Sequence, residues 1–207
     1  MNGPASTSGD DLAYVRALAE RGAHAPLLGG RFMIWWGALL TAAYVAHYLG
    51  LSGRFGQDGR IFAIIWPGFS IVGMIGHFLL VRSIRGKAGA GSAGNLASRS
   101  VWVAAAFAIG AQVVGSAIAA ANGAGPATFD WVVPVAFAVY ACALVVTGSL
   151  AANRTVVAAG AGAVLMVGLF TALILHPDRY LVAAAGVALT VFLPGILLLM
   201  AEPKDRD

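Results

Sequence analysis

Six long stretches without a charged side chain constrain this chain more than any other feature. Each contains more than 20 residues without Asp, Glu, Lys or Arg. They lie between Arg31 and Arg54, Arg60 and Arg82, Arg99 and Asp130, Asp130 and Arg154, Arg154 and Asp178, and Arg179 and Glu202. About 20 apolar residues form a helix long enough to cross a hydrocarbon core of roughly 30 Å. The sequence therefore predicts an all-α, polytopic integral membrane protein with six transmembrane helices arranged as three hairpins.

The composition excludes an ordinary soluble fold. The 207 residues are 59% hydrophobic and 11% charged, whereas about a quarter of the residues of a soluble domain are charged. Trp and Tyr gather near the ends of the apolar stretches, as they do at membrane–water interfaces. The expected spans are 32–51, 61–82, 100–122, 130–150, 155–175 and 180–200, within a single membrane domain at 31–201.

The two polar ends of the chain are expected to be tails. In the first tail, 1–30, the spacing of Leu12, Val15 and Leu18 predicts a short amphipathic helix at 10–22. Residues 202–207 form the second tail. The first apolar run begins only near Phe32, which is too late for a cleaved signal peptide.

The distribution of basic residues predicts the orientation. With the N-terminus inside, ten cations fall on the cytoplasmic side, and only Arg54, Arg60 and Arg179 fall outside. The ten are Arg16, Arg21, Arg31, Arg82, Arg85, Lys87, Arg99, Arg154, Lys204 and Arg206. Cytoplasmic loops carry the excess of Lys and Arg, so we expect both termini in the cytoplasm. Because the cations flank spans, the pI of 9.6 does not indicate nucleic-acid binding.

Catalytic patterns are missing from the sequence. No Asp, Glu, Lys or Arg lies in the middle of a span, which argues against ion-coupled transporters, proton pumps and voltage sensors. The segment GAGSAG (89–94) matches a dinucleotide-binding pattern, but neither a strand nor a suitably placed acid accompanies it. We interpret 83–98 as a flexible linker and Cys142 as a buried, inert thiol. We expect neither an enzyme nor a cofactor.

The histidines are the strongest candidates for metal ligands. His47 and His176 both approach the predicted outer surface, with Asp130 or Asp178 nearby, so they are weak candidates for a metal site. Interfacial or hydrogen-bonded histidines are the favoured interpretation, so we expect no metal site. His47 and His77 differ in height by about 15 Å at a rise of 1.5 Å per residue, so they are not expected to ligate one haem together.

Four polar residues fall near the predicted middle of the membrane. Counted from the span ends, these are Ser70, Gln112, Tyr140 and Thr190. Buried polar side chains cost free energy unless they are hydrogen-bonded. We therefore expect them to face inward and to bond between helices. A ligand pocket lined by the same residues is the alternative.

The first half of the chain resembles a known group of proteins. The segments concerned are RFMIWWGALLTAAYVAHYLGL (31–51), IIWPGFSIVGMIGHFLL (64–80) and RSVWVAAAFAIG (99–110). They resemble a group of small polytopic bacterial membrane proteins that are often found beside winged-helix transcription regulators. The resemblance implies a location in a bacterial inner membrane and, by analogy, a regulatory or sensing role, and it brings no catalytic residues with it.

Two functions remain open from the sequence. The first is a non-catalytic sensor or partner-binding module, possible as a homo-oligomer, whose cytoplasmic face binds a cytoplasmic or membrane protein. Its partner-facing residues would be Arg16, Arg21, Arg85 and Lys87. The alternative is a channel, carrier or binding protein for a small neutral or apolar molecule, which would use the midplane polar residues. A cofactor-bearing redox protein is a more distant alternative.

Overall fold

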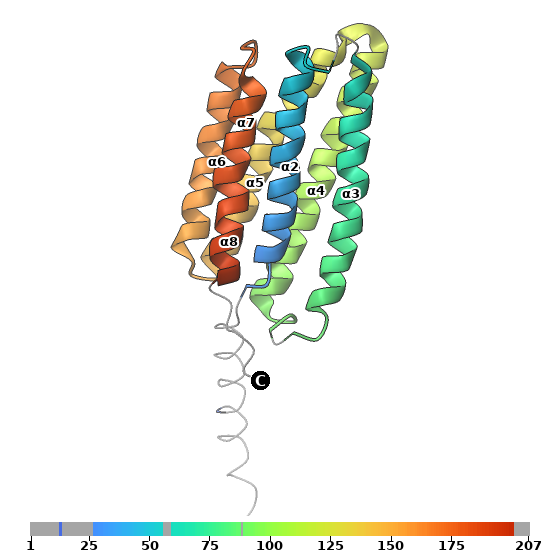
Figure 1. The fold of residues 1–207 in the computed structure, drawn as a ribbon. Helices are drawn as coiled ribbons and strands as arrows, with labels where there is room; N and C mark the ends of the chain where they lie inside the picture. Colours follow the sequence, from blue (N-terminus) through green and yellow to red (C-terminus); the bar gives the residue numbers. More distant parts are fainter. Residues whose placement is uncertain (1–12, 14–26, 56–58, 88, 201–207) are drawn as a thin grey trace, which may run out of the picture.

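The computed structural model describes residues 27–55, 59–87 and 89–200, together with Ala13. This part of the chain is 86% helical and contains no strand. Six helical stretches are long and apolar enough to cross a membrane: Gly30–Leu51, Gly59–Ile84, Ala93–Ala124, Pro126–Leu150, Arg154–Ala172 and Arg179–Met200. They stand side by side as an antiparallel bundle (Figure 1). The prediction of an all-α, multi-pass membrane protein is confirmed.

Several spans combine regular and irregular helix. The first span is α2 (Gly30–Leu51), and the second joins the 3₁₀ turn η1 (Gly59–Ile61) to α3 (Phe62–Ile84). The third and fourth are α4 (Ala93–Ala119) with the π-helical η2 (Ala120–Ala124), and η3 (Pro126–Trp131) with α5 (Val132–Leu150). α6 (Arg154–Ala172) is the fifth. The last span consists of α7 (Arg179–Val187), the π-helical η4 (Ala188–Phe192) and α8 (Leu193–Met200).

The connection is about half as long as the linker expected at 83–98, because 83–84 and 93–98 are helical. α3 continues to Ile84, and α4 already begins at Ala93 rather than at 100. The hydroxyl of Ser92 accepts the backbone N–H of Asn95, at 3.3 Å, and so caps the first turn of α4. The last two residues of the GAGSAG segment, at 93–94, therefore begin α4, whereas 89–92 form the turn before it.

Other predictions fall outside the described residues. These are the amphipathic helix at 10–22, its residues Arg16 and Arg21, and the tail at 202–207.

The bundle has two distinct ends. In Figure 1 the lower end carries the start of α2 and the end of α8, and the upper end carries the turns that follow α2, α4 and α6. The basic residues Arg82, Arg85, Arg99 and Arg154 all belong to the lower end, which the sequence predicts to be cytoplasmic.

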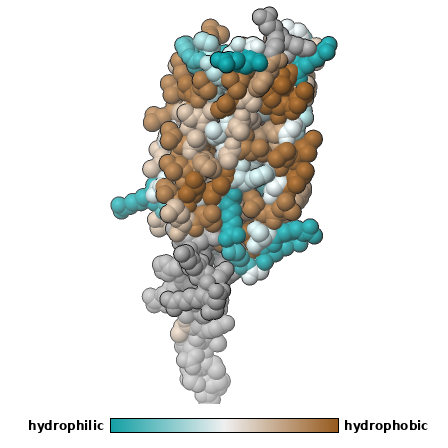
Figure 2. All heavy atoms as spheres, in the orientation of Figure 1, coloured by the Kyte–Doolittle hydropathy of each residue, from teal (hydrophilic) through white to brown (hydrophobic). Residues whose placement is uncertain are grey.

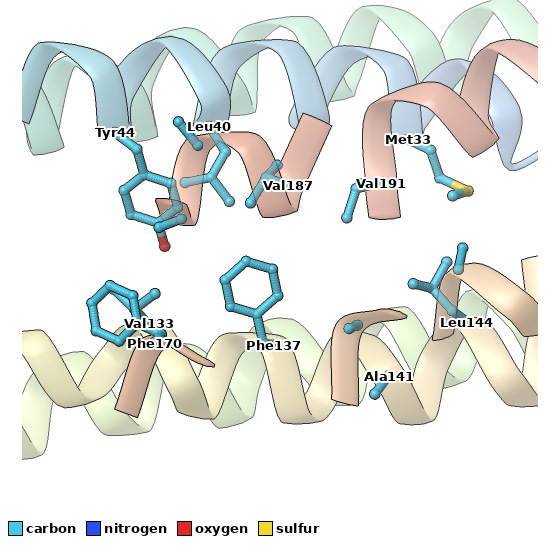
Figure 3. Packing of buried hydrophobic residues seen from close by; sticks show 14 of the residues in the cluster. Met33, Leu40, Tyr44, Val133, Phe137, Ala141, Leu144, Phe170, Val187 and Val191 are labelled. Carbon is cyan, nitrogen blue, oxygen red and sulfur yellow. The ribbon is translucent and has the colours of Figure 1, made fainter. Parts of the chain in front are cut away.

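The core is built from four of the six spans. Buried residues of α2, α5, α6 and the last span form one apolar cluster. In Figure 3 the side chains of Tyr44, Leu40 and Met33 face those of Phe137, Ala141 and Leu144 across this core. Among the described elements α3 packs mainly on α2, and α4 mainly on α5 with the adjoining turns. α3 and α4 therefore flank a four-span core.

Glycines let α2 approach the last span closely. A Cβ added at Gly37 would lie 2.8 Å from the Cα of Phe192, and one at Gly195 would lie 2.8 Å from the backbone nitrogen of Ile34. Such backbone-to-backbone contact is how transmembrane helices gain packing energy without a hydrophobic driving force. The contact fixes η4 and α8 against the first span.

The outer surface of the bundle is apolar over its middle (Figure 2). Large exposed side chains are most frequent on α3 and α4, and they include Ile64, Ile71, Ile75, Phe78, Phe107 and Val114. A surface of this kind suits contact with lipid chains. Cys142 lies on this exposed surface, so the prediction that it is buried is wrong.

Candidate functional site

Two reciprocal hydrogen bonds join α2 to α3. The indole Nε1–H of Trp66 on α3 donates to Nδ1 of His47 on α2, at 3.1 Å. The indole Nε1–H of Trp36 on α2 donates to Nδ1 of His77 on α3, at 3.3 Å. Each helix therefore supplies one tryptophan donor and one histidine acceptor. Because the helices are antiparallel, the two pairs lie in opposite halves of the interface.

A repeated spacing places these side chains. In both helices the histidine follows the tryptophan by eleven residues, at Trp36 and His47 and again at Trp66 and His77. Eleven residues are about three turns of 3.6 residues, so both side chains project from the same face of their helix. This W-x10-H repeat in consecutive spans was present in the sequence, and the sequence analysis missed it.

Glycines on α3 receive the indole rings of α2. A Cβ added at Gly73 would lie 2.3 Å from the ring of Trp36, and one at Gly76 would lie 2.2 Å from the ring of Trp35. The Nε1–H of Trp35 also donates to the carbonyl oxygen of Gly73, at 3.0 Å. The rings thus lie directly on the α3 backbone, where no larger residue fits.

The hydrogen bonds define the state of both histidines. An indole N–H can only donate, so Nδ1 of His47 and of His77 must accept, and the neutral ring carries its proton on Nε2. A histidine that ligates a metal binds it through an unprotonated nitrogen and donates its other N–H to a neighbouring acceptor. Neither ring has that arrangement. The geometry favours an interhelical role for both.

A partly buried ion pair lies at the upper end of the bundle. A guanidinium nitrogen of Arg179 lies 3.2 Å from Asp130, and the two side chains are only 17% and 13% exposed. The hydroxyl of Tyr180 donates to the other carboxylate oxygen of Asp130. The ring of Tyr180 stacks on that of His47, with 3.8 Å between centroids. Asp130, Tyr180, His47 and Trp66 therefore connect η3, α7, α2 and α3.

The two proposed metal ligands lie in different surroundings. His47 belongs to the aromatic network, whereas Nδ1 of His176 lies 3.7 Å from a carboxylate oxygen of Asp178 on the exposed turn before α7. Arg179 stands between the two regions, because it also donates to the carbonyl oxygen of His176, at 3.2 Å. Within the described residues, no group of three or more His, Cys, Asp or Glu could hold a metal ion.

Hydrogen bonds between helices were expected for the midplane residues, and this expectation is wrong. The hydroxyl of Ser70 donates to the carbonyl of Trp66, at 3.0 Å, and that of Thr190 to the carbonyl of Gly186, at 2.7 Å. The amide of Gln112 lies 3.4 Å from the hydroxyl of Ser116 in the same helix. A hydroxyl can reach the carbonyl four residues earlier in its own helix, so it needs no partner from another span.

Tyr140, the fourth midplane residue, packs against aromatic rings. Its ring centroid lies 5.9 Å from that of Trp102 and 6.4 Å from that of Phe137. A side-chain hydrogen bond between α4 and α5 lies near the lower end of the bundle instead. It joins the buried hydroxyls of Ser98 and Thr147, at 3.2 Å. The four midplane residues are thus not brought together as one polar site.

Asn95 organises the lower end of the bundle. Its side-chain oxygen accepts the backbone N–H of Leu28, at 3.0 Å. Its amide nitrogen donates to the carbonyl of Gly89 and to the hydroxyl of Ser92, at 3.0 and 3.1 Å. The segment before α2 is thus tied to the connection between α3 and α4. Of the predicted partner-facing residues in that connection, Arg85 is exposed and Lys87 is half-buried.

Comparison with known proteins identifies no family for this chain. No protein-family model, no curated protein and no solved structure matches it. The resemblance of its first half to small bacterial membrane proteins therefore stays a prediction.

Proposed function

We propose that this chain is a non-catalytic protein of a bacterial inner membrane that binds a protein partner through its cytoplasmic face, as a sensing or regulatory module. The observation that supports this most is the contrast between the two ends. At the upper end Asp130 and Arg179 neutralise each other and are mostly buried. At the lower end Arg82, Arg85 and Arg99 are exposed, and no carboxylate of the described residues pairs with them.

The lower end also offers an ordered surface. Asn95 holds the segment before α2 and the connection between α3 and α4 in one arrangement through its hydrogen bonds to Leu28, Gly89 and Ser92. A surface that is ordered before binding loses less conformational entropy on association. Exposed arginines add electrostatic attraction and specificity for an acidic partner surface. The partner that complements this surface is therefore an acidic protein segment.

The other candidate functions receive no specific support. Ser70, Gln112 and Thr190 bond within their own helices, so their hydrogen bonds do not support a shared midplane pocket for a small molecule. The histidines accept hydrogen bonds from tryptophans, which does not favour a redox cofactor. The resemblance to proteins found beside winged-helix regulators agrees with a regulatory partner by analogy only.

Cross-linking in the native membrane tests this proposal. A photoreactive amino acid at Arg85 should give a covalent adduct with another protein, whereas the same amino acid at exposed Arg54, at the upper end, should not. The double change Arg82→Glu and Arg99→Glu should abolish the Arg85 adduct, because it reverses the charge of the proposed surface. An adduct that survives charge reversal, an adduct only with a second copy of the chain, or no adduct at all would contradict the proposal.

A further inference from the structure

We propose a second site at the lower end, in the turn between α5 and α6, that holds the phosphate headgroup of an anionic phospholipid. A depression of about 400 Å³ lies there. Ser149, Asn153 and Arg154 form its polar wall, and Val157, Ala158 and Ala161 form its apolar wall. A phospholipid has the same division, with a charged head next to an acyl chain.

Small residues create the depression. α5 and α6 meet so closely that a Cβ added at Gly148 would lie 2.7 Å from the backbone nitrogen of Val157. The short side chains of Ala158 and Ala161 then leave space on the exposed side of α6. Asn153 keeps the turn in place, because its side-chain oxygen accepts the backbone N–H of Val156, at 3.2 Å. The depression is thus built by the packing of the hairpin itself.

The apolar wall continues along a face of α6 that points away from the core. Arg154, Ala158, Ala161 and Leu165 recur at the spacing of one helix face. All four are exposed, and Leu165 is 75% exposed. In a membrane this face meets lipid chains. A headgroup at Arg154 would therefore place its acyl chain along Ala158 and Ala161 towards Leu165.

The charge of the site favours an anionic lipid over a zwitterionic one. No Asp or Glu occurs between Asp130 and Asp178, so neither α5 nor α6 supplies a carboxylate to Arg154. A guanidinium donates two parallel N–H bonds to a phosphate, whereas a choline or ethanolamine cation would be repelled. Basic pockets between spans on the cytoplasmic side bind anionic headgroups, and the lower end is the one predicted to be cytoplasmic.

The test compares lipids on the purified chain in detergent. Native mass spectrometry would measure the apparent affinity for phosphatidylglycerol and for phosphatidylcholine with the same acyl chains. We expect the wild-type chain to prefer phosphatidylglycerol. Arg154→Gln should weaken this binding about fivefold, because one basic residue near a membrane contributes about 1 kcal/mol of attraction. Arg85→Gln is the matched control, because it removes an exposed arginine from the same end but not from the depression. It should retain the preference.

Two further arms separate a lipid site from other phosphate binding. Ala158→Phe keeps every charge but fills the depression, and it should weaken phosphatidylglycerol binding as well. Inorganic phosphate and glycerol phosphate, added in excess, should not displace the bound lipid. Equal losses in Arg154→Gln and Arg85→Gln would show general attraction and overturn the site. Displacement by free phosphate would also overturn it, in favour of a phosphate site without a lipid.

Discussion

Trp66 and His47 form the hydrogen bond that ties the upper half of α3 to α2, with 3.1 Å between the indole Nε1 and the imidazole Nδ1. The same imidazole stacks on Tyr180, whose hydroxyl donates to Asp130. Through one histidine, the peripheral helix α3 is thus linked to α7 and to η3. Because α3 packs mainly on α2, we expect this link to stabilise the packing of α3 against the bundle.

Removing the donor tests that link. Trp66→Phe keeps an aromatic ring but loses the N–H. It should lower the free energy of unfolding by about 1 kcal/mol, which is what one interhelical hydrogen bond in a membrane contributes. Reversible unfolding in mixed micelles measures the change. Trp102→Phe is the control, because Trp102 makes an aromatic contact and no hydrogen bond among the described residues. In a double-mutant cycle with His47→Phe the losses should not add. Additive losses would contradict the bond.

The glycine contacts predict a larger effect at the same interface. Gly76→Ala places a Cβ 2.2 Å from the ring of Trp35, so the ring or the helix must move. We expect a loss of about 1–3 kcal/mol in the free energy of unfolding, as overpacking usually costs. Gly110→Ala is the matched control, since nothing lies within 4 Å of its added Cβ. Equal effects of the two changes would show that Gly76 is not a contact position.

The ion pair at the upper end predicts that changing Asp130 lowers the stability more when Arg179 is present than when it is replaced. Asp130→Asn still accepts the Tyr180 hydroxyl but leaves the Arg179 guanidinium mostly buried without a counter-charge. Removing one partner of a buried pair is costly, and we expect about 2 kcal/mol at this partly exposed site. Adding Arg179→Gln should restore at least half of the lost stability. A double variant that is less stable than Asp130→Asn would contradict this account.

The sequence alone was sufficient for the spans but not for the contacts between them. Charge-free stretches between residues such as Arg31 and Arg54 locate spans because charge is costly in lipid, and that cost depends on composition alone. The charge of Arg99 predicts a span that begins at 100, whereas Ser92 caps a helix that begins at Ala93. A charge marks where a helix meets water, and a cap marks where the helix begins.

The site shows a different limit. Height along a span follows from counting residues, but the direction in which a side chain points does not. Ser70 and Thr190 share a level, yet each bonds to its own backbone. The pairing of Asp130 with Arg179 requires η3 to lie beside the start of α7, which depends on the packing of separate hairpins. The W-x10-H repeat is one contact signal that the sequence does contain.

The midplane gives a prediction of small effect. Gln112 lies 3.4 Å from Ser116 in its own helix, so Gln112→Leu should leave a folded protein and cost less than about 1–2 kcal/mol. Thermal unfolding in detergent would measure this. Ser116→Ala is the informative comparison, because the Ser116 hydroxyl also donates to the carbonyl of Thr128, at 2.9 Å, and so ties α4 to η3. It should cost more than Gln112→Leu. The reverse order would contradict the assignment.

Cysteine labelling tests the predicted orientation, on which both proposals depend. The native Cys142 is exposed on the bundle, so it is first replaced by Ala to remove background. Single cysteines at Ser52 and Ala127, both exposed at the upper end, should then react with an impermeant thiol reagent added outside intact cells. Cysteines at Ser92 and Asp205 should react only after the membrane is permeabilised, because ten of the thirteen cations are placed on their side. Labelling of Ser92 from outside would reverse the orientation, and the exposed arginines of the lower end would then face away from the cytoplasm.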